Sequence, residues 1–99
     1  MNHPNLTELR EQIDSIDREL ITVLAKRFDL TNMVGDYKAQ QDLSAFDSVR
    51  EQEQAASYRQ AASMHGLNPE FVQHLFQYIR TEVVKNHQAI RAQREHCVE

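Results

Sequence analysis

The sequence has few of the residues that break helices or build disulfide frameworks. Its 99 residues include two glycines, two prolines, one cysteine and no tryptophan. This scarcity, beside a long run rich in Ala, Glu, Gln, Leu and Arg, favours helices over sheet. The single cysteine, Cys97, leaves no disulfide framework and no metal-ligand spacing. The length suits one small domain with one core.

Long apolar runs and an excess of positive charge are also missing. No stretch approaches the roughly 18 apolar residues that a membrane span requires. The N-terminus has neither a basic start nor an apolar stretch behind it, so no signal peptide is expected. The formal net charge of −4 argues against nucleic acid as a partner, because no cationic stripe outweighs the acidic residues. We therefore expect a soluble, cytoplasmic protein that binds neither membranes nor nucleic acid.

The apolar residues of the N-terminal third are spaced as in a helix that packs against other helices. The steps between them alternate between three and four: Leu6, Leu9, Ile13, Ile16, Leu20, Val23, Leu30, Val34 and Tyr37. This seam predicts a helix from about Leu6 to about Gln41, on the order of 54 Å long. The rest of the chain cannot cover both ends of such a rod. An intertwined homodimer is therefore expected, with each long helix lying along its copy. Gly35 inside this helix is explained if a neighbouring helix approaches closely.

Capping signals predict two further helices after a short loop at 42–47. Ser48 and Glu51 have the S-x-x-E spacing of a capping box, so a second helix is expected to start there and to end at a left-handed Gly66. Asn68 followed by Pro69 predicts the start of a third helix that could reach about Arg91. The apolar stripe of this third helix includes His87 beside Val72, Phe76, Ile79, Val83 and Ile90.

The expected fold is therefore all-α, with a long, a medium and a medium-long helix in each subunit. Residues 1–99 would form one domain, with the core at about 6–91 and a frayed tail at 92–99.

Four cations on this acidic chain indicate an anionic ligand. Arg27 stands on the apolar seam where a leucine is expected, and a guanidinium there needs an anion beside it. Lys38 lies on the same helix face, roughly 16 Å further along. Arg10 is roughly 25 Å from Arg27, so only Arg10 of the partner subunit could join them. Arg50, near the start of the second helix, could complete this group of cations around the ligand. The pattern predicts a site built by two subunits for a compact molecule with more than one carboxylate.

These residues, in this order, resemble the all-helical (AroQ-type) chorismate mutases. The resemblance covers about residues 6–90 and rests on these stretches: Leu9-Arg10-Glu11-Gln12-Ile13-Asp14, Ile16-Asp17, Leu24-Ala25-Lys26-Arg27, Val34-Gly35 with Lys38, Asp47 with Arg50-Glu51, and Leu75-Phe76-Gln77. It implies a three-helix subunit, an entwined homodimer and two equivalent sites.

The resemblance also implies a role for each site residue. The two substrate carboxylates would pair with Arg27 and with Arg10 of the partner subunit. Lys38 would hold a carboxylate and the ether oxygen. Asp47 and Glu51 would hold the ring hydroxyl, with Arg50 among the charges.

The implied reaction converts chorismate to prephenate by an intramolecular [3,3] (Claisen) rearrangement. It needs no nucleophile, metal or cofactor. The protein can restrict the substrate to its chair-like shape and aim donors at the ether oxygen as its bond breaks. An arginine fork suits carboxylates, whereas lysine suits a single oxygen as a point charge.

The third helix departs from the family at two positions. Val83 stands where these mutases usually place a small hydroxyl residue, and a valine cannot donate a hydrogen bond. His87 stands where they usually carry a glutamine facing the ether oxygen. Our hypothesis is that His87 donates in its place, which would make turnover depend on pH through the histidine titration.

Simpler interpretations of the same residues stay open. Arg27 could pair with a core glutamate, and Asp47 and Glu51 could only cap the second helix. His87 could be an ordinary histidine packed between helices.

Other functions also fit the scaffold. A same-fold enzyme could eliminate pyruvate from isochorismate, or rearrange 4-amino-4-deoxychorismate, whose ammonium Asp47 and Glu51 would suit. A non-catalytic helical dimerisation or regulatory module is the alternative outside enzymes. Whether a larger partner enzyme activates the chain is left open.

Overall fold

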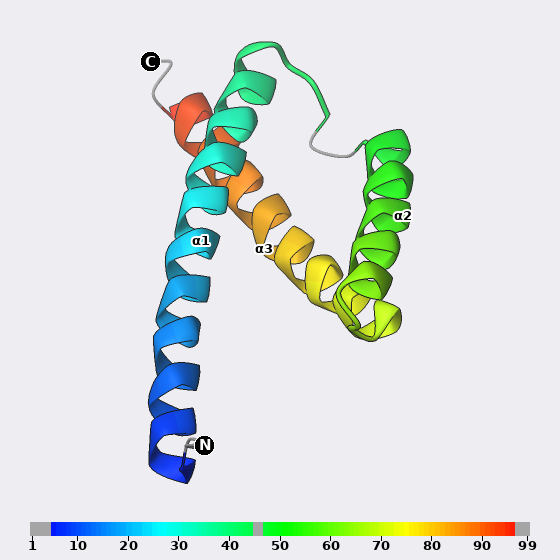
Figure 1. The fold of residues 1–99 in the computed structure, drawn as a ribbon. Coiled ribbons are helices and arrows are strands. Elements are labelled where there is room, and N and C mark those ends of the chain that lie inside the picture. Colours follow the sequence, from blue (N-terminus) through cyan, green and yellow to red (C-terminus); the bar gives the residue numbers. More distant parts are fainter. Residues whose placement is uncertain (1–4, 45–46, 97–99) are drawn as a thin grey trace. The chain divides into compact units, whose positions relative to one another are not determined.

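The computed structural model of the chain describes residues 5–44 and 47–96. Figure 1 shows the three helices of these residues in chain order, which are α1 (Leu6–Gln40), α2 (Ser48–Met64) and α3 (Pro69–His96). Their lengths are 35, 17 and 28 residues. The described residues contain no strand. The prediction of an all-α fold with a long, a medium and a medium-long helix is therefore confirmed.

The chain forms two compact units, Met1–Thr31 and Asn32–Glu99. In the first unit, α1 begins after Asn5, whose side-chain oxygen accepts a hydrogen bond from the backbone N–H of Glu8 at 2.9 Å. This N-cap satisfies one of the donors that have no partner inside the helix. The apolar seam of this unit is exposed: Leu6, Leu9, Ile13, Ile16, Leu20 and Val23.

In the second unit, α1 ends in a Schellman arrangement that was not predicted. The N–H of Leu43 donates to the carbonyl of Lys38 at 2.8 Å, and the N–H of Asp42 donates to the carbonyl of Ala39 at 3.3 Å. Asp42 has a φ of 52°, the left-handed conformation that this helix end requires. The turn therefore uses an aspartate where glycine is usual, which short polar side chains tolerate.

The N-cap of α2 corrects the sequence interpretation. The helix begins at Ser48 as predicted, but its N-cap is Asp47, whose Oδ1 accepts from the N–H of Arg50 at 3.0 Å. The Ser48–Glu51 capping box is therefore wrong. A carboxylate one residue earlier takes the capping position, where the helix dipole also favours negative charge.

Both ends of the turn between α2 and α3 are as predicted. Gly66 has a φ of 71°, and the N–H of Leu67 donates to the carbonyl of Ala62 at 2.8 Å. Asn68 caps α3 by accepting from the N–H of Glu70 at 3.0 Å, and Pro69 is the first residue of the helix. α3 continues past the predicted end at about Arg91 as far as His96. The last tail residues, Cys97 among them, lie outside the described residues.

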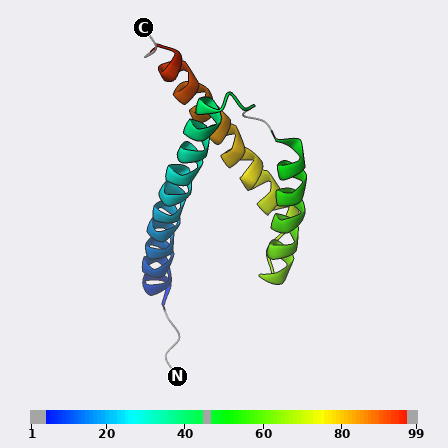
Figure 2. The same ribbon diagram turned by 90° about the horizontal axis from the view of Figure 1, so that it is seen from above.

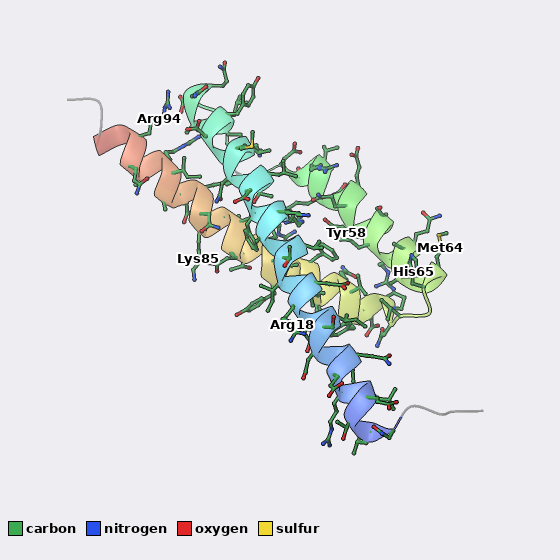
Figure 3. All side chains as sticks on the ribbon, turned by 60° about the vertical axis from the view of Figure 1, so that its left-hand side comes forward. Arg18, Tyr58, Met64, His65, Lys85 and Arg94 are labelled. Carbon is green, nitrogen blue, oxygen red and sulfur yellow. The ribbon has the colours of Figure 1, made fainter. Side chains whose placement is uncertain are left out.

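The core of the second unit lies between α2 and α3, which fold back beside each other after this turn (Figures 1 and 2). The rings of Tyr58 and Phe76 stack with their centroids 3.8 Å apart. Ala62, Val72 and Ile79 are the buried apolar residues of the described chain. Figure 3 labels Tyr58 on α2 and, at the turn, Met64 and His65. The first part of the predicted apolar stripe of α3, which contains Val72, Phe76 and Ile79, therefore faces this core.

Among the described residues, no helix combines the length and apolar character needed to cross a membrane.

Candidate active site

The second unit contains six of the eight predicted site residues. They come from the end of α1, the start of α2 and the middle of α3: Lys38, Asp47, Arg50, Glu51, Val83 and His87. Arg10 and Arg27 belong to the first unit. The end of α1 and the start of α2 are close in the chain, whereas the α3 residues of this unit come from more than 30 residues further along.

His87 lies directly against the backbone of α1. Its side chain is buried, with 7% of the residue exposed, and Gly35 is buried as well. A Cβ atom placed on Gly35 would lie 2.5 Å from Cδ2 and 3.0 Å from Nε2 of the His87 ring. The imidazole therefore occupies the space that any side chain at position 35 would need. The predicted close approach of a neighbouring helix at Gly35 is confirmed, and the neighbour is α3.

Lys38 lies one turn beyond Gly35, and Arg91 of α3 contacts the main chain around it. Nη2 of Arg91 donates to the carbonyl of Lys38 at 3.4 Å and to the carbonyl of Leu43. The carbonyl of Lys38 thus accepts a second hydrogen bond besides the one from the N–H of Leu43. Lys38 itself is half-buried. The helix end that carries Lys38 is therefore fixed by α3.

A second arginine of α3 reaches the same end of α1. Nη1 of Arg94 lies 3.7 Å from Oδ1 of Asp36. Figure 3 labels Arg94 near the C-terminal end of α3. The sequence analysis missed both Arg91 and Arg94, because their acceptors lie on another helix, far away in the chain.

The start of α2 carries the acidic residues of the predicted site. Asp47 is exposed and acts as the N-cap, so its structural role is established by the hydrogen bond from Arg50. Arg50 is exposed, and Glu51 is half-buried. Oε1 of Glu51 lies 3.3 Å from Nη1 of Arg80 on α3. Glu51 therefore forms an ion pair between two helices and does not cap α2.

Arg80 is a residue of this region that the sequence analysis missed. It lies seven residues before His87, which is two helical turns less about 20°, so the two share a face of α3. Val83, half-buried, lies between them on that face. The position of Arg80 next to Ile79 of the stripe was the available signal, but the contact with Glu51 depends on how α2 and α3 pack.

In the first unit, Arg27 is half-buried and its Nη1 atom is buried, whereas Arg10 is exposed. The two arginines are seventeen residues apart on one unbroken helix, roughly 25 Å along its axis. A single small ligand cannot contact both within one chain.

The family model described as chorismate mutase type II matches residues 9–88. This range includes every predicted site residue from Arg10 to His87. The chain therefore belongs to the chorismate mutase type II family, and the resemblance noted from its sequence is confirmed.

Two curated proteins that are similar to this chain are named T-protein. The one from Enterobacter agglomerans is 36% identical over 77 residues, which cover 78% of this chain and 21% of the relative. The one from Haemophilus influenzae is 33% identical over 81 residues, which cover 82% of this chain and 22% of the relative. The chain thus spans about a fifth of the length of these relatives.

The contact between His87 and Gly35 predicts an unusual effect of a small substitution. In an ordinary helix interior, alanine is roughly 1 kcal/mol better than glycine. Here Gly35→Ala should instead lower the free energy of unfolding by about 1–2 kcal/mol, since overpacking costs roughly 1–3 kcal/mol. Denaturant unfolding at a fixed protein concentration measures the effect.

The matched control is the same substitution in a His87→Ala background, where the ring is gone. There Gly35→Ala should be neutral or stabilising. An equal loss of stability in both backgrounds would show that the imidazole is not what excludes a side chain at position 35.

Proposed function

We propose that the chain converts chorismate to prephenate by an intramolecular rearrangement, in a cationic site shared between two copies of the chain. The observation that carries this proposal is the family match over residues 9–88, which contains all eight residues predicted for the site. The product would serve aromatic amino acid synthesis in the cytoplasm.

The exposed seam of α1 supports a homodimer. Large apolar residues along the first unit lie in contact with water, including Ile13, Ile16 and Leu20, each more than half exposed. Burying a Leu or Ile fully is worth roughly 1.5–3 kcal/mol, so a second copy along this face would gain considerable stability. In such a dimer, Arg10 of the partner subunit would complete the site.

The residues present suit a reaction that proceeds without a nucleophile. Arg27 and Arg10 of the partner subunit would pair the two carboxylates, and bidentate pairing would hold the substrate in its folded shape. Lys38 would place its positive charge beside one carboxylate and the ether oxygen. As the ether bond breaks, negative charge grows on that oxygen, and a fixed donor stabilises it most at that moment.

In the proposed mechanism, His87 would assist Lys38. Gly35, against which its ring packs, precedes Lys38 by one helical turn. The imidazole would donate to the ether oxygen in place of the usual glutamine. Asp47 and Glu51 would accept from the ring hydroxyl.

The direct test is to incubate the purified protein separately with chorismate, isochorismate and 4-amino-4-deoxychorismate, and to identify the products by chromatography. Prephenate should form from chorismate well above the spontaneous rate. Arg27→Leu should reduce turnover by about 100-fold or more, the size found when a key charge-stabilising donor is removed. The same variant should fold about as well as the wild type, since a leucine at this position continues the apolar seam of α1.

Two outcomes would contradict the proposal. One is the absence of prephenate above the background rate. The other is full activity of Arg27→Leu, which would favour a non-catalytic module that keeps the scaffold.

The role proposed for His87 is tested by exchanging its donor group. His87→Gln keeps an N–H group that can donate to the ether oxygen, whereas His87→Leu has none. We therefore expect kcat to stay within about tenfold of the wild type in His87→Gln and to fall by about 100-fold or more in His87→Leu. Initial rates at saturating chorismate measure both variants. Equal values of kcat in the two variants would exclude His87 as the donor.

A further inference from the structure

The ion pair between Arg80 and Glu51 lies where a substrate group would be recognised. Nη1 of Arg80 is 3.3 Å from Oε1 of Glu51, and both residues belong to the second unit. The Glu51 side chain is 22% exposed and that of Arg80 is 46% exposed. Glu51 is the more enclosed partner, and the guanidinium of Arg80 lies directly beside its carboxylate.

The face of α3 that carries Arg80 is the face that carries the proposed site. His87 follows Arg80 by two turns, roughly 10 Å along the helix, and its ring is fixed against Gly35. The cation at Lys85 offers a contrast. It pairs with Glu82 on its own helix at 3.9 Å, its side chain is 70% exposed, and Figure 3 shows it extending outward from α3.

We propose that Arg80 determines substrate specificity, because its guanidinium beside Glu51 lets this position accept a neutral hydroxyl and reject an ammonium. The inference rests on the proposed function, in which Glu51 holds the ring hydroxyl of chorismate.

The physical argument concerns the local charge. A carboxylate alone attracts an ammonium more strongly than a hydroxyl, since the first contact is an ion pair. Once Arg80 balances the charge of Glu51, an incoming ammonium gains little net attraction and lies within a few ångströms of a second cation. A hydroxyl still donates to the carboxylate at no such cost. Of the two substrates that Asp47 and Glu51 could suit, chorismate is therefore favoured over its 4-amino analogue.

The test compares kcat/KM for chorismate with kcat/KM for 4-amino-4-deoxychorismate in four proteins. They are the wild type, Arg80→Met, which keeps the length of the side chain without its charge, Arg80→Lys, which keeps the charge, and the control Lys85→Met. If the amino analogue is not turned over, its inhibition constant is compared with the KM for chorismate instead. The ratio of the two constants on one sample does not depend on the fraction of protein that folds.

We expect Arg80→Met to shift the ratio toward the amino analogue by about tenfold, whereas Arg80→Lys and Lys85→Met stay within about twofold of the wild type; tenfold corresponds to about 1.4 kcal/mol. A purely structural tie between α2 and α3 would lower both constants equally and leave the ratio unchanged, which would overturn the inference. An equal shift in Lys85→Met would overturn it too, since any lost cation would then suffice.

The wild-type measurement separates this inference from the proposed function. Conversion of chorismate with an unaltered ratio in Arg80→Met refutes the role of Arg80 alone. Failure of the wild type to convert chorismate refutes the proposed function, and the inference with it.

Discussion

An arginine side chain keeps its positive charge in proteins, so each guanidinium that folding removes from water needs acceptor oxygens in exchange. In the second unit, arginines of α3 find such acceptors on the other helices. Arg91 reaches main-chain carbonyls at the end of α1. Arg94 lies beside Asp36, and Arg80 beside Glu51. In the proposed site, the carboxylates of a substrate supply acceptors of the same kind, which is how one scaffold serves both folding and binding.

The apolar core of the second unit is small, so the polar contacts contribute a larger share of what holds its helices together. Its core consists of a few buried residues between α2 and α3, with one stacked aromatic pair. The contact of His87 with Gly35 adds a close approach of α3 to α1. The apolar seam of α1 is exposed, in keeping with this small core. A chain that buries so little apolar surface by itself gains most stability when a second copy covers the rest.

Local signals in the sequence predicted the helices well. The spacing of apolar residues, in alternating steps of three and four, predicted α1. Gly66, Asn68 and Pro69 predicted the turn before α3, since caps act over only a few residues. The N-cap of α2 was misassigned because Asp47 and Ser48 are adjacent and both are good caps. The sequence pattern alone does not decide which of two adjacent capping residues is the N-cap.

The site was predicted less completely than the fold. Gly35 and His87 were each noticed, but their contact depends on the register between two helices, which no local pattern contains. The same holds for the pair of Arg80 with Glu51. A residue's spacing gives its face on a helix, whereas its partner follows only from packing. The family match covers residues 9–88, the range that contains all eight residues predicted for the site.

The central claim is that two copies of the chain build each site together, and subunit complementation tests it most directly. Arg10→Ala and Lys38→Ala proteins, each almost inactive alone, are unfolded, mixed in equal amounts and refolded. Half of the dimers should then contain one subunit of each kind, and one of their two sites has both Lys38 and Arg10 of the partner subunit. The mixture should regain about a quarter of the wild-type activity, as expected for a closed two-fold dimer. A mixture no more active than its separate components would contradict the account.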